Sequence, residues 1–159
     1  MNQPQSAPDL SPRYETGAEM LIAGLSAHYS TADASGIPAQ WKRFAPSIGS
    51  MAGKIGTAAY GVIYDGDADS IDYLTGVQVA DSAALPTGFT HLRIPTRRYA
   101  VFRHRGHVSN IRNTMEEICS TWLPKLDGEC GAPSFERYGD DFDPVTGLGI
   151  VEIWIPLRR

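Results

Sequence analysis

The residue of this chain best suited to chemistry is a glutamate in a short aromatic run. Glu136 stands in the segment PSFERYG, between Phe135 and Arg137. In a strand, alternation at period two places Ser134 and Tyr138 on the same face as Glu136. A carboxylate in an apolar groove is costly unless a cation or hydrogen-bond donors compensate it, so a cationic ligand helped by cation–π contacts would suit this position. The same segment is also compatible with a glutamate at a strand edge that is solvated or paired with an arginine.

Other candidates lie on strands and on one amphipathic helix. Glu152 and Trp154 share the mixed face of the last strand, Tyr60 and Tyr73 lie in two β-rich runs, and Trp41 lies in IPAQWKRF. Tyrosine suits a groove because its ring stacks while its hydroxyl reaches a polar partner. Core packing accounts for these aromatic residues as well, and for Trp41 it is the favoured interpretation. The predicted ligand-binding residues are Glu136, Trp154, Tyr60, Tyr138, Tyr73, Glu152 and Trp41.

No catalytic or metal-binding constellation emerges from the sequence. The four histidines lack metal-ligand spacing, and the pair His104 and His107 has no third ligand nearby. A G-x-S-x-G motif and a glycine-rich phosphate loop are both missing. The basic stretch from Arg97 to His107 is typical of a solvated face. We therefore expect no metal, no cofactor and no enzymatic activity.

Composition restricts the class of protein further. The chain has 159 residues, 42% of them hydrophobic, and a net charge of −4. This length predicts one globular domain, and the acidic balance argues against nucleic acid and mildly favours neutral or cationic partners. Two cysteines are too few for a disulfide framework, and no apolar run approaches the length of a membrane span. We expect a bacterial cytoplasmic protein without membrane contact, and its oligomeric state stays open.

Hydrophobic periodicity predicts that the order strand–helix–strand–strand occurs twice along the chain. Residues 1–12 are expected to form a flexible tail, and the halves span about 13–82 and 88–159. Pro46 lies deep in the first helical pattern, so a kink or two short helices are expected there. The fold class is therefore α+β, with duplicated β-α-β-β units, an antiparallel sheet and a central ligand groove. The expected elements are strands 19–30, 58–66, 71–80, 89–95, 97–106, 133–139 and 148–157, and helices 37–48 and 108–126.

A β-α-β-β unit cannot bury both faces of its own sheet. Its helix covers one face, and the other needs a partner or a ligand. In the last strand Val151, Ile153 and Ile155 form an apolar face suited to a helix, whereas Glu152 and Trp154 belong to the mixed face. We expect a groove between two such mixed faces, lined by aromatic side chains and a few carboxylates.

Four ordered segments give the chain a family resemblance: YAVFRHRGH, TWLP, PSFERYG and VEIWIPL. Together with IPAQWKRF they resemble the gyrase-inhibitor-like (GyrI-like) effector-binding domain, which also serves as the ligand-sensing part of some AraC-type and MerR-type regulators. The resemblance covers residues 13–159. It implies a duplicated fold whose central groove takes amphipathic, often cationic and aromatic compounds, with Glu136 as the buried counter-charge.

The resemblance leaves the role of the protein open. No helix-turn-helix accompanies the domain, so it resembles a stand-alone sensor or sequestering protein for hydrophobic or cationic aromatic compounds. Two alternatives stay open: a hydrolase of a reactive xenobiotic, with Glu136 as general base or acid and a tyrosine such as Tyr60 assisting, or an inhibitor of a topoisomerase-like protein partner.

Overall fold

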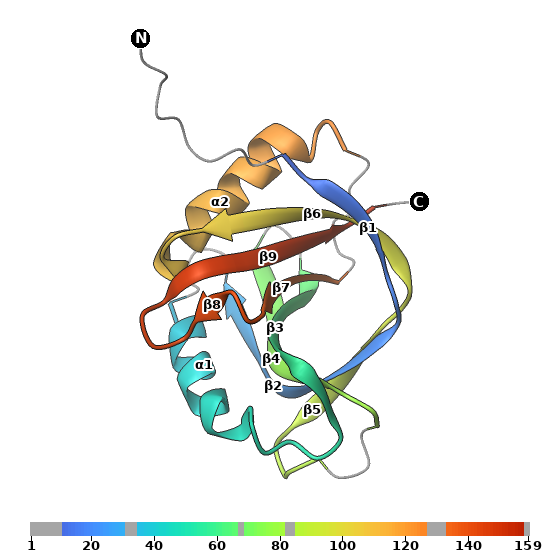
Figure 1. The fold of residues 1–159 in the computed structure, drawn as a ribbon, viewed down its shortest axis with the longest axis vertical. Helices are drawn as coiled ribbons and strands as arrows, with labels where there is room; N and C mark the ends of the chain where they lie inside the picture. Colours follow the sequence, from blue (N-terminus) through green and yellow to red (C-terminus); the bar gives the residue numbers. More distant parts are fainter. Residues whose placement is uncertain (1–10, 31–34, 67–68, 82–84, 127–132, 158–159) are drawn as a thin grey trace.

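The described residues form one curled antiparallel sheet with two short helices (Figure 1). The computed structural model describes residues 11–30, 35–66, 69–81, 85–126 and 133–157. The strands follow the order β1-β6-β9-β7-β3-β4-β2-β5, and β8 pairs with β9. The strands are β1 Arg13–Gly17, β2 Met20–Ser30, β3 Lys54–Gly66, β4 Ser70–Val79, β5 Thr90–Ile94, β6 Arg97–Arg105, β7 Ser134–Tyr138, β8 Phe142–Asp143 and β9 Leu148–Pro156. The helices are α1 Ile37–Phe44 and α2 Ile111–Glu117, with 3₁₀ turns at Ala45–Ser47 and Val108–Asn110 and a π-helical turn at Ile118–Trp122.

The strand order repeats about the junction of β3 and β7. On one side of it lie β3, β4 and β2, and on the other lie β7, β9 and β6. Each set belongs to one strand–helix–strand–strand unit, so the two units meet where β3 pairs with β7. The outer strands are exchanged, because β1 pairs with β6 of the second unit and β5 pairs with β2 of the first. The predicted α+β class with duplicated units is confirmed.

Both helices lie on one face of the sheet (Figure 1). Phe44 of α1 packs against Leu21, Ala23 and Val77 of β2 and β4. On the second unit, Ile118, at the end of α2, packs against β6 and β9 in the same way. The alternating apolar positions of these strands explain the arrangement, since one face of each strand is matched to a helix. The strands at the junction, β3 and β7, lie between the two helix-covered areas, and we call this side of the sheet the helix face.

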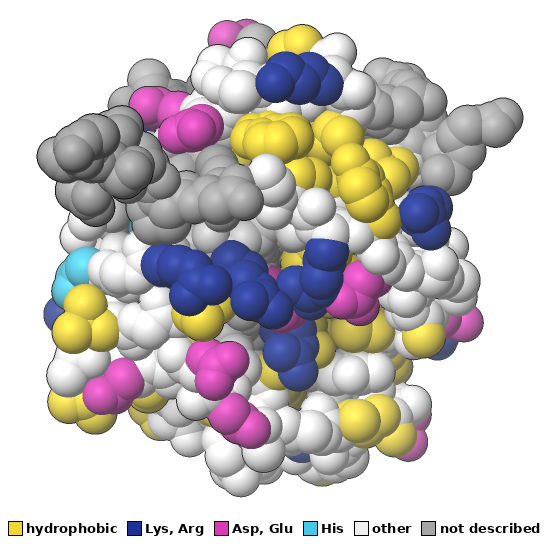
Figure 2. Space-filling view, turned by 45° about the horizontal axis from the view of Figure 1, so that its top comes forward, with side chains coloured by type: hydrophobic (Ala, Val, Ile, Leu, Met, Phe, Trp, Pro, Cys, Tyr) yellow, Lys and Arg dark blue, Asp and Glu magenta, His cyan; other side chains and the backbone are white. Residues whose placement is uncertain are grey.

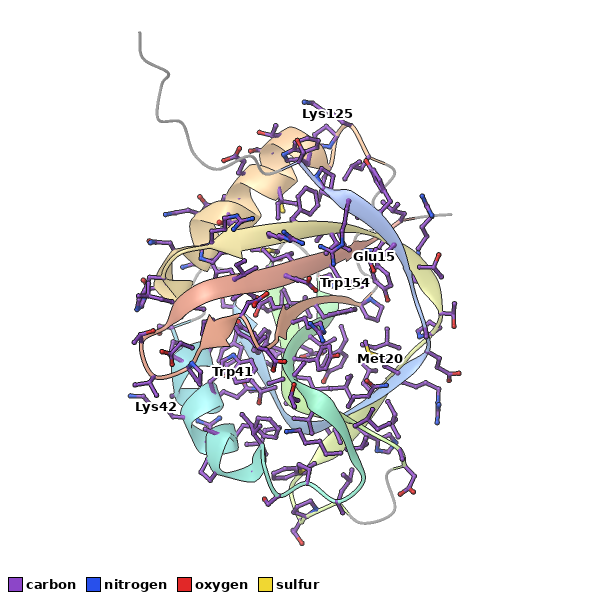
Figure 3. The ribbon with its side chains drawn as sticks, viewed as in Figure 1. Glu15, Met20, Trp41, Lys42, Lys125 and Trp154 are labelled. Atoms are coloured by element: carbon purple, nitrogen blue, oxygen red, sulfur yellow. The ribbon has the colours of Figure 1, made fainter. Side chains whose placement is uncertain are left out.

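The opposite face curls upon itself and encloses a second core. Its buried residues include Ile22, Val62, Val101 and Phe135, which come from strands of both units. Figure 3 shows Trp154 and Met20 reaching into this enclosed space, and Trp41 lying with α1 on the other side. We call this side the interior face. It is held mainly by side chains of the sheet itself, because both helices lie on the other face.

Several details differ from the expectations. The structure adds the short strand β1 and the two-residue strand β8, both of which the periodicity missed. The break expected at Pro46 is confirmed, since α1 ends at Phe44 and a 3₁₀ turn holds the proline. The prediction that the basic stretch from Arg97 to His107 is solvent-exposed is wrong for His104, which is 3% exposed. Its Nδ1 lies 2.6 Å from Thr114 Oγ1 of α2, so this histidine ties the helix to β6. The predicted tail lies, up to residue 10, outside the described residues.

Candidate functional site

Glu136 stands on the helix face at the junction of the two units. In antiparallel strands, directly opposed residues share a face. Glu136 of β7 lies opposite Gly61 of β3 and Ile153 of β9, and Ile153 packs in the cluster beneath α2. The carboxylate therefore projects from the middle of the sheet, between the areas that α1 and α2 cover.

Neutral hydrogen-bond donors surround this carboxylate. Glu136 Oε1 accepts a hydrogen bond from Tyr73 Oη at 2.9 Å and another from Tyr138 Oη at 2.7 Å. Trp41 Nε1 of α1 donates in turn to Tyr73 Oη at 3.0 Å. One helix and two strands thus hold these four residues, which we call the Glu136 cluster: Trp41, Tyr73, Glu136 and Tyr138. The structure brings together four of the seven predicted ligand-binding residues here.

A glycine makes room for the cluster. A Cβ atom added at Gly61 would lie 2.1 Å from Tyr73 Oη and 2.8 Å from Glu136 Oε1. Such distances are far below van der Waals contact, so no larger residue fits without displacing the hydrogen-bonded groups. An isolated glycine inside a strand marks such a close approach.

Burial sets the charge state of the cluster. Desolvation raises the pKa of Glu136 above its ordinary value, and the hydrogen bonds from Tyr138 and Tyr73 act against that rise. Desolvation also raises the pKa of Tyr73 and of Tyr138 well above the usual tyrosine value, and the Glu136 charge adds to both shifts. The two hydroxyls therefore stay protonated at neutral pH and remain donors.

The second carboxylate oxygen is left free. Glu136 Oε2 accepts no hydrogen bond from the described residues, and no described lysine, arginine or histidine forms an ion pair with Glu136. Every fully buried polar side-chain atom of the described residues has a hydrogen-bond partner. Oε2, which has none, therefore retains access to solvent, and it is a hydrogen-bond acceptor that no cation among the described residues meets.

Aromatic rings flank the carboxylate on the side of α1 and β8. The Trp41 ring lies 5.0 Å from the Tyr138 ring, and the Phe142 ring of β8 lies 5.1 Å from the Tyr138 ring. Both pairs are edge-to-face. Ring faces beside a carboxylate suit a cation that carries apolar groups, since the charge meets Oε2 and the π-faces contribute further.

Three predicted residues lie elsewhere. The register pairs Phe135 with Trp154 and Arg137 with Glu152, so Trp154 and Glu152 stand on the interior face, opposite to Glu136. Tyr60 packs in the interior core with Phe135 and Trp154. The structure does not bring these three residues to Glu136, because the mixed face of the last strand turns into the curl of the sheet.

Sequence reasoning missed two residues of the site. Gly61 could have been noticed as a lone glycine in an apolar strand, which indicates close approach of another group. Phe142 lies in the acidic segment after β7, and its nearness to Tyr138 depends on the β8–β9 pairing. No local signal marks that contact.

The structure gives no support for a metal centre in the described part of the chain. No group of three histidine, cysteine, aspartate or glutamate side chains there is arranged to hold a metal ion. Among the same residues, no helix has the length and apolar character needed to cross a membrane.

The family of the chain follows from a comparison with known protein families. The GyrI-like small molecule binding domain matches residues 11–158. The chain belongs to the GyrI-like family. This confirms the resemblance seen in the sequence and identifies the chain as a GyrI-like small-molecule binding domain.

A curated relative of this GyrI-like chain is a transcriptional regulator. The transcriptional regulator BrlR of Pseudomonas aeruginosa is 28% identical over 134 residues, which is 82% of this chain. The match covers 49% of BrlR, so the GyrI-like chain spans about half the length of this curated relative.

Solved structures share the fold of the GyrI-like chain. A structure of SAV2435 bound to tetraphenylphosphonium has a TM-score of 0.77 and 22% identity, with 94% of each chain covered. The C-terminal domain of EcmrR has a TM-score of 0.64 and 17% identity, covering 92% of this chain and 96% of that one. At these identities the likeness establishes the fold alone.

Proposed function

We propose that the protein binds hydrophobic or aromatic cations at the Glu136 cluster and acts as a sensor or sequestering protein for them. One observation carries this proposal: Glu136 is desolvated, two neutral hydroxyls hold its Oε1, and its Oε2 has no partner among the described residues. A cation bound at Oε2 would restore the electrostatic compensation that the site lacks. Tetraphenylphosphonium, which SAV2435 binds in its solved structure, belongs to this chemical class.

The pH dependence of binding follows from the raised pKa. Only the ionised carboxylate attracts a cation, so affinity should increase as the pH rises through the pKa of Glu136 and then level off. The two tyrosine hydroxyls do not ionise in that range, because their pKa values are raised well above the usual one. A single titration step is expected.

Three tryptophans provide a spatially resolved assay for this proposal. Trp41 belongs to the Glu136 cluster, Trp154 lies on the interior face, and Trp122, in the π-helical turn that follows α2, packs beside Phe102. Tetraphenylphosphonium should shift the Trp41 indole N–H signal in a ¹⁵N-correlated NMR spectrum and leave that of Trp122 in place. Substituting each tryptophan by phenylalanine assigns the three signals.

The decisive variant is Glu136→Gln, with Glu152→Gln as its matched control on the other face. Two unit charges about 4 Å apart interact by about 4 kcal/mol at an effective dielectric constant of about 20. We therefore expect Glu136→Gln to weaken tetraphenylphosphonium binding at least tenfold in calorimetry, and Glu152→Gln to leave it within about twofold. Triphenylphosphine oxide, a neutral compound of similar shape, should bind both proteins equally. Equal affinity of the cation for wild type and Glu136→Gln would overturn the proposal.

The proposal extends to a bacterial cytoplasmic setting, which the low cysteine content supports. The kinship with BrlR, over about half of that regulator, favours a sensing role in the control of transcription. In such a role the ligand-bound state of this domain is the signal. Ligand-dependent change in the expression of neighbouring genes, lost in Glu136→Gln, would test it.

A further inference from the structure

A second hollow lies on the interior face, away from Glu136. It has a volume of about 200 Å³, and its aromatic walls are Tyr60, Tyr99, Phe135 and Trp154. Phe135 and Trp154 are stacked at 16° with ring centroids 5.3 Å apart, and Tyr99 meets both of them edge-on. The connection between β1 and β2, residues 17–20, forms the other side. We call this space the interior cavity.

Arginine provides the charge of this cavity. Arg137 lines the interior cavity and also a neighbouring hollow of about 100 Å³ that includes Arg103 and Glu152. Figure 2 shows a face of the molecule on which basic side chains gather around a small area of acidic and hydrophobic surface. The ion pairs place Arg13 and Arg137 on either side of Glu152.

The guanidinium of Arg137 is poorly paired. Glu152 Oε2 accepts a hydrogen bond from Arg13 at 3.0 Å, and Glu152 Oε1 accepts one from Trp154 Nε1 at 3.0 Å. Arg137 is left with one contact to Glu152 Oε1, at 3.9 Å, which is beyond hydrogen-bond distance. Its side chain is 41% exposed. Planar guanidinium donors are thus available beside the aromatic walls.

The acidic residue of the cavity does not cancel this charge. Glu19 lines the interior cavity, and its carboxylate is paired with Arg93 at 2.8 Å. The cavity therefore combines aromatic side chains with an available cation of the kind that binds a carboxylate through two parallel hydrogen bonds.

The size of the space restricts the ligand. A cavity of about 150 Å³ lined by apolar side chains holds one benzene molecule. The interior cavity is somewhat larger, so one aromatic ring with a small substituent fits within it.

We propose that the interior cavity is a second ligand site, which binds a monocyclic aromatic carboxylate with its ring against Trp154 and Tyr99 and its carboxylate on Arg137. This site is separate from the Glu136 cluster and opposite to it in charge preference. Consecutive residues of β7 serve the two sites, since Glu136 faces the helices and Arg137 the interior.

The test uses three planar compounds of nearly equal shape: benzoate, benzamide and benzamidine, which are anionic, neutral and cationic. Benzoate should bind at least tenfold more tightly than the other two in calorimetry at low salt. In the ¹⁵N-correlated spectrum it should shift the indole signal of Trp154, whose N–H is bonded to Glu152, and leave those of Trp41 and Trp122 unchanged.

Substitutions then test whether Arg137 is the residue that binds the carboxylate of benzoate. Arg137→Met should remove the preference for benzoate over benzamide, and Arg137→Lys should retain part of it. The matched control Arg103→Met, which alters only the neighbouring hollow, should retain it in full. Glu136→Gln should bind benzoate like the wild type, so failure of the cation proposal leaves this one testable.

The following results would overturn the second site: equal affinity for benzoate and benzamide in the wild type, no binding of benzoate to protein with a well-dispersed spectrum, an unmoved Trp154 signal, or an unchanged preference for benzoate over benzamide in Arg137→Met. A benzoate-induced shift of Trp41 that disappears in Glu136→Gln would move the compound to the Glu136 cluster and equally refute the interior site.

Discussion

Gly61→Ala tests the packing of the Glu136 cluster directly, because the new methyl group meets the hydrogen-bonded hydroxyl of Tyr73. The added Cβ would stand 2.1 Å from Tyr73 Oη, where ordinary contact begins at 3.4 Å, so the hydroxyl must move by more than an ångström. A hydrogen bond of 2.9 Å to Glu136 does not survive such a displacement. Tyr73 is only 2% exposed, which leaves its ring little freedom to yield.

The expected loss of stability in Gly61→Ala follows from the interactions that the variant disrupts. Overpacking of a close-packed site costs about 1–3 kcal/mol. Leaving buried partners unsatisfied costs about 1–3 kcal/mol more, since Tyr73 both donates to Glu136 and accepts from Trp41. We expect Gly61→Ala to lower the free energy of unfolding by about 2–6 kcal/mol, a large part of the stability of a small domain.

Chemical denaturation with a double-mutant cycle provides the assay. Gly49→Ala is the matched control, because nothing lies within 4 Å of a Cβ at that glycine. Tyr73→Phe removes the atom nearest to the new methyl group, so the double variant Gly61→Ala/Tyr73→Phe should be more stable than the sum of the single effects by about 1 kcal/mol or more. If Gly61→Ala costs no more than Gly49→Ala, or the two effects simply add, the packing argument is refuted.

Three further predictions concern charge and anchoring. The folded-state pKa of Glu136 is raised, so its contribution to the free energy of unfolding is fully present below the ordinary glutamate pKa and is lost as the pH rises through the folded-state value. Unfolding curves from pH 3 to 8 should therefore show Glu136→Gln gaining stability relative to the wild type as the pH rises. A constant difference between the two proteins would contradict the shift. Gln40 of α1 is fully buried and donates to backbone carbonyl groups of β2 and β4, so Gln40→Leu should cost about 1–3 kcal/mol in denaturation and weaken cation binding by loosening α1; unchanged stability would argue against this anchor. His104→Leu should cost about 1–3 kcal/mol by removing the bond to Thr114, with hydrogen exchange quickening in α2 and not in α1; equal exchange in both helices would count against it.

Local sequence patterns sufficed for most of the elements, though not for β1 and β8, and for the central residue of the proposed site. The helical spacing around Trp41 predicts α1, and Pro46 predicts where it ends. Alternation in the run PSFERYG places Glu136 and Tyr138 on one face of β7, and a carboxylate among rings points to a cation. These properties depend on residues within one strand or one helix, so the chain alone expresses them.

The pairing of strands and the packing of the helices on the sheet decided the rest. Alternation shows that Trp154 and Glu152 share a face, but it does not show which face the helices cover. The register that sets Phe135 opposite Trp154, and Glu136 opposite Ile153, separates these residues from the Glu136 cluster. A shift of one residue would exchange the two faces. Register and curl arise from contacts between separate elements of the chain, and therefore only the tertiary structure puts the two proposed sites on opposite faces of one strand.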